Sequence, residues 1–403
     1  MMKLLFLAPS RLSKGDASLA ADVARALPRK RFRVGFVAAA DAVPQLHDLG
    51  MPTLPLTGAT AADNAGQLDR IVRGFDPDCL IAADAFALHQ SRDWDGPTVD
   101  GLRQRYARPV GSLDRIGWAQ TGYTVDFYGG ARVRLPRLLD ACDVVIRTGP
   151  PHRPEPGPPG VVVAPLHSGG LHDGGLRPAA TDEPPSGAAR PVVFLVNSPW
   201  EHRISRRSQP ALQLIDALPR LLHSHLAAVG RPLRIVHVGP RRWRFAVAEH
   251  LEYQHFSRLP YPMFHARLAT AAAFVTTNAL SATLARAVLA GVPSLVLHND
   301  TASDRLPDWV AATAPLLRSA YPFRIAPLGW HELLAPLAAG NPYFGCFAGA
   351  GLFDRPAVVQ ALIGLLDGRP DLRQRQQEYR DRLAALPSPA DALHTAVREA
   401  VAR

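Results

Sequence analysis

Residues 259–300 read LPYPMFHARLATAAAFVTTNALSATLARAVLAGVPSLVLHND, and this stretch contains the clearest structural signal in the chain. Two short apolar runs, Ala273–Thr276 and Ser294–His298, have the composition of parallel strands that are covered on both faces. A helix-like run over 284–290 stops at Gly291-Val292-Pro293, because glycine suits the position after a helix and proline cannot continue one. We therefore expect a strand–turn–helix–strand unit.

Three polar side chains lie at the predicted start of that helix: Asn278, Ser281 and Thr283. The first turn of a helix presents backbone N–H groups without partners and the positive end of the helix dipole, and both favour an anion. An amide and two hydroxyl groups add side-chain donors at the same point. The pattern predicts a phosphate-binding site, although an ordinary βαβ unit with a polar N-cap has the same residue types.

The same stretch resembles the donor-binding motif of the GT-B glycosyltransferases. That motif usually has a His-Gly-Gly turn, a Thr, and a Glu-Ala pair before a closing Gly-Val-Pro. Counted back from the closing tripeptide, Thr283, Ala287 and Gly291-Val292-Pro293 match it. The resemblance implies two Rossmann-like domains facing across a cleft, a nucleotide-sugar donor, and a diphosphate bound around Thr283.

The chain departs from the motif at four positions. Asn278 stands where the family has His, Ala279 and Leu280 replace the two glycines, and Arg286 replaces the Glu that usually holds the ribose. Arg286 has no acceptor for ribose hydroxyls, but it could supply a cation to the ligand. These differences keep open a GT-B-like protein with changed or lost chemistry, either a nucleotide-sugar epimerase or a protein that binds a nucleotide or phosphate ligand.

The composition indicates two globular domains and an anionic ligand. The chain has 403 residues, of which 47% are hydrophobic, and its net charge is +10. Two domains of similar size are expected at this length. An arginine-rich balance suits a nucleotide diphosphate. Nucleic acid is the rival ligand, but the arginines are scattered and no nucleic-acid motif is present, so we expect no nucleic-acid partner.

The cysteines and the N-terminus indicate the cellular compartment. Cys79, Cys142 and Cys346 are far apart in sequence, which argues against a disulfide framework or a zinc knuckle. Pro9 ends the first apolar run, over 4–8, too early for a signal peptide, and no apolar stretch is long enough to span a membrane. We expect a soluble cytoplasmic protein without an integral membrane segment.

Strand-like and helix-like segments alternate from a strand over 3–8 to a strand over 79–83, and the alternation restarts at a strand over 192–196. This pattern predicts an α/β fold with two doubly wound parallel sheets. Three other segments give weaker signals. Residues 94–128 show little periodicity, residues 138–146 read as a helix and a strand, and residues 246–252 read as a short helix.

A Pro- and Gly-rich segment over 181–190 is the expected linker between the domains. We divide the chain into an N-terminal acceptor-side domain over 1–185 and a C-terminal nucleotide-donor domain over 186–386. The GT-B resemblance implies that a last helix, over 387–403, crosses back to the N-terminal domain.

An inverting GT-B enzyme needs a general base, and ligands of doubly wound sheets lie beyond the carboxyl ends of the strands. Asp16 follows the first predicted strand, in the loop where the family often has a His, and is the first candidate for that base. Asp84, which follows the strand over 79–83, is the second. A carboxylate can serve where its surroundings raise its pKa. Asp16 also has an ordinary alternative role as the N-cap of a helix beginning at Ala17.

Two loops offer further contacts to the donor. Ser198 lies where GT-B enzymes often have a Gly-Ser turn, and Arg203 in the same loop adds a positive charge. Asp300 and Asp304 stand near the family's acidic contact to donor-sugar hydroxyls, with capping of the following turn as their alternative role. We expect these side chains to complete the donor site.

The remaining charged patterns are less specific. Arg241 and Arg242 could pair with phosphate, although an exposed basic loop is the commoner explanation. His223 and His225 are two residues apart on a predicted helix, so they face different directions and cannot bind one metal ion. We expect no metal and no cofactor, the nucleotide-sugar being a co-substrate.

The resemblance to GT-B glycosyltransferases implies an inverting, metal-independent enzyme that moves a sugar from a nucleotide-sugar donor to a small-molecule acceptor. The Ala- and Arg-rich composition is typical of a high-GC bacterium, in which such enzymes often modify secondary metabolites.

Overall fold

A computed structural model describes most of the chain, and its contacts divide into two compact units. The described residues are 1–9, 15–96, 98–115, 117, 125–126, 133–134, 138–148, 152–164, 190–199, 201–202, 209–299, 306–317 and 335–403. Unit 1 comprises residues 1–124, 135–176 and 381–403, and unit 2 comprises residues 125–134 and 177–380. The expected linker lies outside the described residues except for Arg190.

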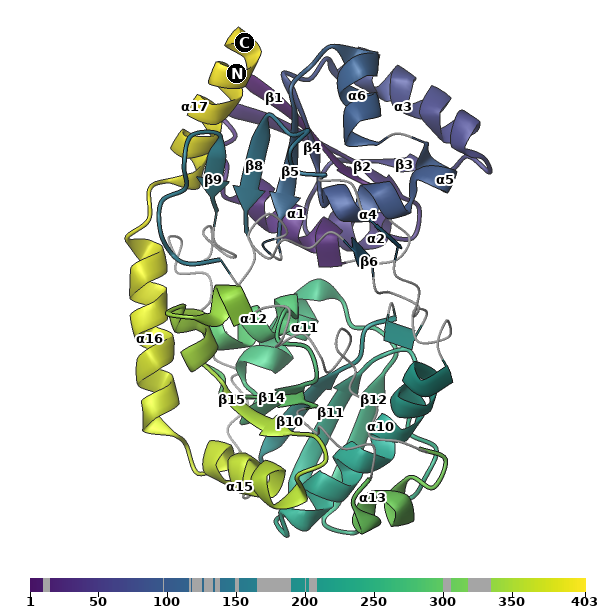
Figure 1. The fold of residues 1–403 in the computed structure, drawn as a ribbon, viewed down its shortest axis with the longest axis vertical. Helices are drawn as coiled ribbons and strands as arrows, with labels where there is room; N and C mark the ends of the chain where they lie inside the picture. Colours follow the sequence, from purple (N-terminus) through teal and green to yellow (C-terminus); the bar gives the residue numbers. More distant parts are fainter. Residues whose placement is uncertain are drawn as a thin grey trace. The chain divides into compact units, whose positions relative to one another are not determined.

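Unit 1 is built on a parallel seven-stranded sheet with the strand order β3-β2-β1-β4-β5-β8-β9 (Figure 1). The central strand β4 is fully apolar and buried, and β1 is apolar and buried from Leu4 to Ala8, as expected for a parallel sheet with both faces covered. The strands are β1 (Met2–Ala8), β2 (Phe32–Ala39), β3 (Thr53–Leu56), β4 (Cys79–Ala82), β5 (Val110–Asp114), β8 (Val144–Arg147) and β9 (Val161–Val163).

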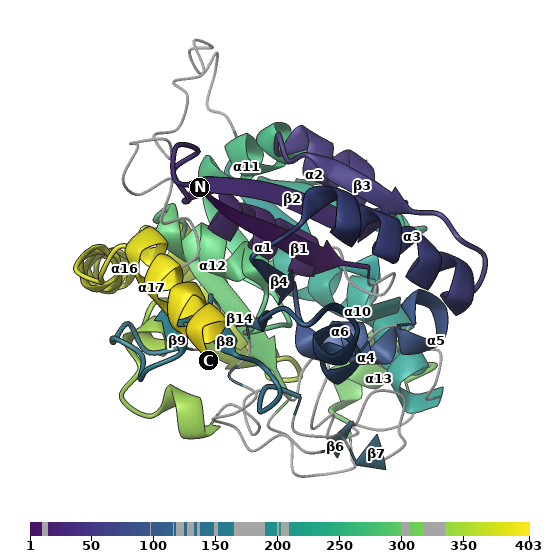
Figure 2. The same ribbon diagram turned by 90° about the horizontal axis from the view of Figure 1, so that it is seen from above.

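Helices connect these strands, and the chain's last helix belongs to the same unit. The helices are α1 (Gly15–Arg25), α2 (Val43–Asp48), α3 (Ala61–Phe75), α4 (Ala85–Gln90), α5 (Arg92–Asp95), α6 (Val99–Tyr106) and α17 (Pro389–Ala402). Helix α17 packs against β8 and β9 (Figure 2). The Arg31 guanidinium pairs with Asp391, and the rings of Phe32 and His394 meet edge to face, so both ends of the chain contribute to one domain.

Unit 2 repeats the design with a parallel six-stranded sheet in the order β12-β11-β10-β13-β14-β15. The strands are β10 (Val192–Val196), β11 (Leu233–Val238), β12 (Leu251–Phe256), β13 (Ala273–Thr276), β14 (Ser294–His298) and β15 (Ala348–Gly351). A separate antiparallel pair is formed by β6 (Val125–Asp126) and β7 (Val133–Arg134). Doubly wound parallel sheets are therefore present in both units, as the sequence predicted.

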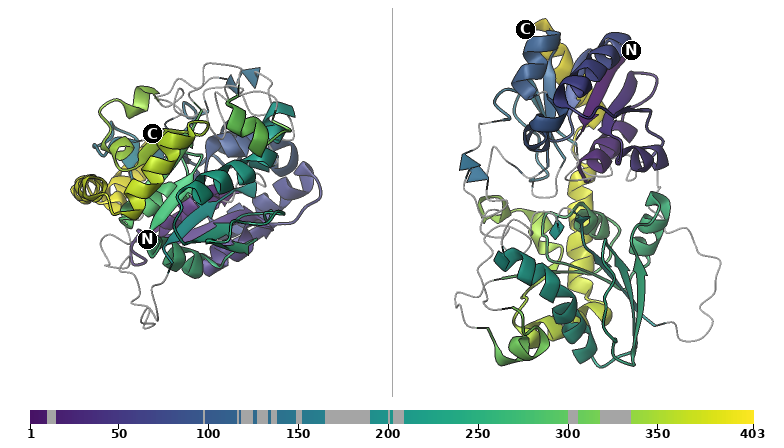
Figure 3. Two further views of the ribbon diagram at one scale, coloured as in Figure 1. Left: turned by 90° about the horizontal axis from the view of Figure 1, so that it is seen from below. Right: turned by 90° about the vertical axis from the view of Figure 1, so that its right-hand side faces the viewer.

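The unit 2 sheet is covered on both faces, and Figure 3 gives two further views of these layers. The helices are α10 (Gln209–Ala228), α11 (Tyr261–Ala269), α12 (Ala282–Leu289), α13 (Asp308–Thr313), the short 3-10 helix η1 (Pro342–Gly345), α15 (Arg355–Leu366) and α16 (Pro370–Ala384). Side chains of β10 alternate between the faces: Val193 and Leu195 pack in the core with α10 and α15, whereas the Phe194 ring meets Phe264 of α11 at 5.4 Å.

Helix α12 ends as the sequence predicted. Gly291 adopts a φ of +76°, which a residue with a Cβ rarely adopts. Its N–H donates to the Val288 carbonyl at 3.1 Å, and the Val292 N–H donates to the Ala287 carbonyl at 2.8 Å. These two bonds form a Schellman motif that satisfies the last carbonyls of the helix. Pro293 then leads directly into β14.

The structure corrects three local predictions. Residues 138–141 form turns rather than a helix, and only the strand that follows is present. Residues 246–252 do not form a helix, because Leu251 begins the edge strand β12, which pairs with β11 along its whole length. The segment over 94–128, which lacks periodicity in sequence, contains helix α6 and the buried strand β5.

Candidate functional site

Four of the predicted site residues follow the strands between which each sheet reverses its strand order. In unit 1 the reversal lies between β1 and β4, and in unit 2 it lies between β10 and β13. Loops leave such neighbouring strands in opposite directions, so side chains at their carboxyl ends border an open crevice. Asp16 and Asp84 follow the first pair of strands, and Ser198 and Asn278 follow the second pair.

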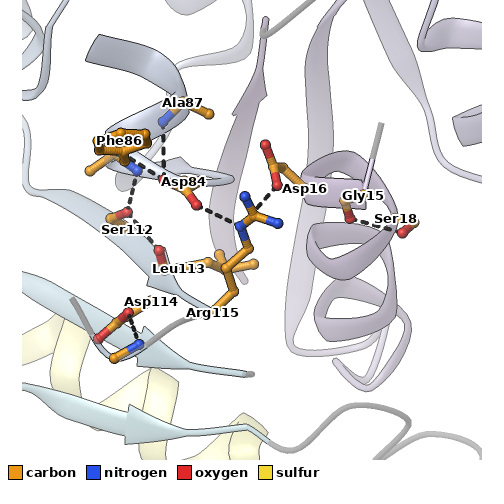
Figure 4. A network of polar contacts seen from close by, with 12 residues as sticks. Gly15, Asp16, Ser18, Asp84, Phe86, Ala87, Ser112, Leu113, Asp114 and Arg115 are labelled. Atoms are coloured by element: carbon orange, nitrogen blue, oxygen red, sulfur yellow. Dashed lines mark hydrogen bonds and ion pairs between the residues drawn. The ribbon is translucent and has the colours of Figure 1, made fainter. Parts of the chain in front are cut away.

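In unit 1, Asp16 and Asp84 meet at one guanidinium, that of Arg115 (Figure 4). Arg115 Nε lies 2.8 Å from Asp84 Oδ2 and 3.1 Å from Asp16 Oδ1. Both carboxylates are almost completely buried, and the Arg115 side chain is 24% exposed. Buried charges persist only when they are paired, so Arg115 compensates the negative charge at this edge of the sheet.

Both carboxylate oxygens of Asp84 accept hydrogen bonds in this arrangement. Its Oδ1 accepts hydrogen bonds from the backbone N–H groups of Phe86 (2.7 Å) and Ala87 (3.0 Å), so it is the N-cap of α4, while Oδ2 accepts from Arg115. Ser112 of β5 supports the same turn by accepting from the Ala85 N–H at 2.9 Å. These contacts give Asp84 a structural role.

Asp16 has a different position. Helix α1 begins at Gly15, so Asp16 lies in its first turn and is not the N-cap of a helix beginning at Ala17. The Ser18 hydroxyl donates to the Gly15 carbonyl at 2.8 Å within this turn. A carboxylate in the first turn of a helix also interacts favourably with the helix dipole. Of the two predicted bases, Asp16 is the one that caps no helix.

A buried histidine lies at the end of the neighbouring strand β5. His152 Nε2 lies 2.6 Å from the Asp114 carbonyl oxygen, so this nitrogen carries the hydrogen, and Asp114 Oδ1 accepts from the Gly117 N–H at 2.8 Å. Burial lowers the pKa of His152, and the nearby Asp114 opposes that change. His152 therefore adds a neutral imidazole to this edge at neutral pH.

In unit 2, the turn between β13 and α12 is organised by its own side chains. Asn278 Oδ1 accepts from the Leu280 N–H at 2.9 Å, and Ser281 Oγ accepts from the Thr283 N–H at 3.2 Å, which makes Ser281 the N-cap of α12. Within the described residues, no hydrogen bond involves the Asn278 amide nitrogen or the Thr283 hydroxyl group. The turn is thus rigid but retains two side-chain groups that can donate to a ligand.

Arg286 lies one turn further along α12. Its guanidinium carbon is 5.2 Å from the centroid of the Tyr261 ring, a cation–π distance, and the Tyr261 ring is in turn 4.2 Å from the ring of His265. Arg286 is 6% exposed. The cation that replaces the family's Glu is therefore packed against helix α11.

The loop after β10 contains a neutral polar network. His237 Nε2 donates to Asn197 Oδ1 at 2.9 Å, and His237 Nδ1 accepts from the Tyr253 hydroxyl at 2.8 Å. Burial lowers the pKa of His237 to about 4, with smaller contributions from His255 and His202. The imidazole is therefore neutral at neutral pH, and it fixes the orientation of the Asn197 amide.

Glu201 is a buried acid in the same loop. Its Oε2 accepts from the Ser198 N–H at 3.0 Å, which uses the backbone of the predicted Ser198 rather than its hydroxyl. Burial raises the pKa of Glu201 to about 7, against the lowering effect of hydrogen bonds from Ser198 and Asn197. A carboxyl group with such a pKa can exchange a proton near neutral pH.

The other predicted contacts cannot be placed. Arg203, Asp300 and Asp304 lie outside the described residues. Among the described residues, no group of three or more His, Cys, Asp or Glu side chains could hold a metal ion. Within the same part of the chain, no helix is long and apolar enough to cross a membrane. The three cysteines are unpaired.

Sequence reasoning missed four of these site residues: Arg115, His152, Glu201 and His237. Arg115 follows β5, whose sequence Val-Gly-Ser-Leu-Asp gives a weak strand signal. Glu201 lies in the loop that follows the predicted strand over 192–196, and His237 lies near the end of a predicted strand, so the sequence pattern could have placed both at the carboxyl edge of the sheet. The burial of Glu201 and His237 could not be predicted, because it depends on packing between segments that are distant in sequence.

Comparisons with known proteins agree on the fold. A model of a family described as "Family of unknown function (DUF6365)" matches residues 23–401. No curated protein matches the sequence. Solved structures that match include the spinosyn forosaminyltransferase SpnP, with 15% identity, a TM-score of 0.57 and full coverage of both chains. The glycosyltransferase VinC in complex with DTDP has 16% identity, a TM-score of 0.55 and full coverage.

A third match is the spinosyn rhamnosyltransferase SpnG complexed with spinosyn aglycone. It has 16% identity and a TM-score of 0.53, and the alignment covers 98% of this chain and 99% of that one. At such identities the comparison establishes the architecture. The chain therefore has the GT-B fold that the resemblance in residues 259–300 implied.

Proposed function

The chain belongs to the DUF6365 family of unknown function and has the GT-B fold, and from these premises we propose that it is a glycosyltransferase. It would transfer a sugar from a nucleotide-sugar donor to a small-molecule acceptor in bacterial secondary metabolism, in the cytoplasm. The observation that carries the proposal is the turn before α12, where Asn278 and Thr283 retain donor groups at a helix N-terminus. Two of the matched proteins, VinC in complex with DTDP and SpnG complexed with spinosyn aglycone, support these substrate classes.

In the proposed reaction, an acceptor hydroxyl oxygen attacks the anomeric carbon of the donor. The new glycosidic bond forms as the bond to the diphosphate oxygen breaks, and the configuration at that carbon inverts. The hydroxyl proton passes to a general base, and Asp16 is our candidate because Asp84 is occupied as a helix cap. Donors at the α12 turn would stabilise the charge of the departing nucleoside diphosphate without a metal ion.

The decisive experiment measures nucleotide affinity rather than turnover. Isothermal titration of the wild-type protein with thymidine and uridine diphosphates should show binding. The Thr283→Ala variant should bind roughly ten- to a hundredfold more weakly, since a charge-assisted hydrogen bond contributes about 1.5–3 kcal/mol. Thr270→Ala is the matched control, because Thr270 is an exposed threonine whose hydroxyl bonds only to its own helix. Equal affinities of Thr283→Ala and the wild type would remove the main support for sugar transfer.

A second candidate function is a GT-B-like protein with changed or lost chemistry, either an epimerase or a nucleotide-binding protein. The packing of Arg286 against Tyr261 favours it, because no acceptor for ribose stands at this position. In the Arg286→Glu variant, an increased affinity for an ordinary nucleoside diphosphate sugar would support the transferase. Product analysis with and without a chelator, including the configuration of the new bond, separates inverting metal-independent transfer from epimerisation.

A further inference from the structure

Unit 2 contains a cavity whose lining does not include the α12 turn. It has a volume of about 500 Å³ and lies between helix α10 and the segment over 239–250, which connects β11 to β12. This connection contains no helix, and it leaves side chains of residues 241–245 beside those of α10. Asn197 and His237 border the cavity, whereas none of the residues 278–286 does.

Four arginines line this cavity: Arg220, Arg241, Arg242 and Arg244. Arg241 pairs with Asp216 at 2.8 Å. Within the described part of the chain, no carboxylate pairs with the other three. His237 adds no charge, because burial lowers its pKa to about 4. Asp216 also lines the cavity, so four guanidinium groups stand against one carboxylate, and this excess of positive charge attracts an anion.

Stacked aromatic rings form an aromatic wall along one side of the cavity. Trp243 is 5% exposed, and its ring stacks on Tyr253 at 4.6 Å and on Phe245 at 5.5 Å. The Arg220 guanidinium lies over the Phe245 ring at 5.0 Å. Tyr253 is held by His237 and by the Trp243 backbone N–H, at 2.8 and 3.1 Å. The segment that presents Arg242 and Arg244 is therefore anchored by buried side chains.

We propose that this cavity binds a phosphorylated small molecule through Arg220, Arg242 and Arg244. Guanidinium groups match the geometry of phosphate oxygens and can bind them with two parallel hydrogen bonds. The cavity volume exceeds that of an inorganic phosphate and falls in the range typical of sites for small organic ligands. The ligand thus carries an organic group, which packs against the aromatic wall. The shared chemistry is a phosphate ester, which a nucleotide or a sugar phosphate could supply.

The test titrates the full-length protein with inorganic phosphate, glucose 6-phosphate and uridine monophosphate, followed by calorimetry. At least one ester should bind more tightly than inorganic phosphate, and the better ester identifies the source. Arg242→Gln/Arg244→Gln should weaken that binding by roughly a hundredfold, about tenfold for each lost charge-assisted bond. Both arginines are exposed, so the variant should fold. Arg398→Gln, at an exposed position of α17, is the matched control and should bind normally.

The α12 turn is tested in parallel, which separates this site from the proposed donor site. Thr283→Ala should leave binding of the ester unchanged, whether or not it weakens nucleoside diphosphate binding. Three outcomes would overturn the proposal. These are no ester binding to the wild type at millimolar concentration, wild-type affinity in Arg242→Gln/Arg244→Gln, or a loss of ester binding in Thr283→Ala equal to that in the double arginine variant.

Discussion

Polar side chains at the carboxyl edges of the two sheets are stabilised in different ways. At the edge of unit 1, the charged carboxylates of Asp16 and Asp84 are compensated by the Arg115 guanidinium. At the edge of unit 2, the side chains of Asn278, Ser281 and Thr283 are uncharged, and they are ordered by hydrogen bonds within their own turn. The points where the two sheets reverse their strand order are topologically equivalent. The point in unit 1 contains charged carboxylates and a guanidinium, whereas the turn before α12 in unit 2 contains neutral hydrogen-bond donors.

The difference shows which edge is prepared for an anion. The two buried carboxylates and the one guanidinium at the edge of unit 1 together carry a net negative charge, so they do not favour an additional anion, and they depend on one another. Neutral donors at a helix N-terminus remain able to donate hydrogen bonds to an anion. We therefore infer that Arg115 acts first on the stability of unit 1, whereas Thr283 acts first on ligand binding.

The largest expected effect is the loss of the Arg115 charge. Arg115→Leu removes the guanidinium that contacts both buried carboxylates, and removing one partner of a buried ion pair typically costs about 3–5 kcal/mol. Because Arg115 is 24% exposed, we expect a loss near the lower limit, about 3 kcal/mol of the free energy of unfolding. Urea unfolding followed by circular dichroism measures it.

Two further variants show whether the loss of stability in Arg115→Leu comes from the buried carboxylates. Asp16→Asn in the Arg115→Leu background removes one of the two buried negative charges and should recover part of the loss. Arg103→Gln is the control for arginine removal, since Arg103 pairs with Asp143 at 2.9 Å but is 56% exposed, and exposed pairs contribute about 0–1 kcal/mol. If Arg115→Leu is no more destabilising than Arg103→Gln, the charge cluster does not hold this edge together.

The second prediction concerns the neutral state of His237 in unit 2. The pKa of His237 is lowered to about 4 in the folded protein from 6.5. The unfolded chain therefore binds more protons between these values, and stability decreases as the pH falls through this window. This group alone should reduce the free energy of unfolding by about 2 kcal/mol between pH 7.5 and pH 5. His237→Gln should remove that share of the pH dependence in urea unfolding at the two pH values.

His225→Gln is the matched comparison for His237→Gln. Burial also lowers the pKa of His225 to about 4, and its Nε2 donates to the Leu352 carbonyl at 2.9 Å, away from Asn197 and Tyr253. Both variants should flatten the pH dependence equally, but only His237→Gln should release the Asn197 amide. An unchanged pH dependence in His237→Gln would mean that this imidazole is not held neutral by burial.

Much of the fold could be predicted because parallel buried strands appear in the sequence as short apolar runs. β1, β10, β13 and β14 are of this kind. Strand β5 could not be recognised, because Gly111 interrupts its apolar run. A Cβ at Gly111 would lie 3.0 Å from the Val144 carbonyl oxygen, so the close approach of β8 explains the glycine. Strand β15, Ala-Gly-Ala-Gly, has no strand composition and is defined by pairing with β14.

The positions of the site residues were more predictable than their roles. Residue order along strands and turns placed Asp16, Asp84 and Thr283 at the sheet edges. It could not show that Asp84 caps α4, or that Arg115 joins two carboxylates from separate loops. Such roles depend on distances between segments that are remote in sequence. The side-chain hydrogen bonds of Asn278 and Ser281 are local by contrast, because both are formed within one turn.

The smallest expected effect comes from Ser281, and it separates helix capping from ligand binding. Ser281 Oγ accepts from the Thr283 N–H at 3.2 Å, so Ser281→Ala should cost about 1 kcal/mol of stability, whereas Ser281→Gly should cost only a few tenths, because glycine is itself tolerated at an N-cap. A hydroxyl that accepts this bond can still donate its own hydrogen to a phosphate oxygen. Both variants should then weaken nucleoside diphosphate binding equally, by roughly tenfold, although they differ in stability. If affinity instead follows stability across the two variants, Ser281 only shapes the turn, and the donors of the phosphate site reduce to Asn278, Thr283 and the backbone.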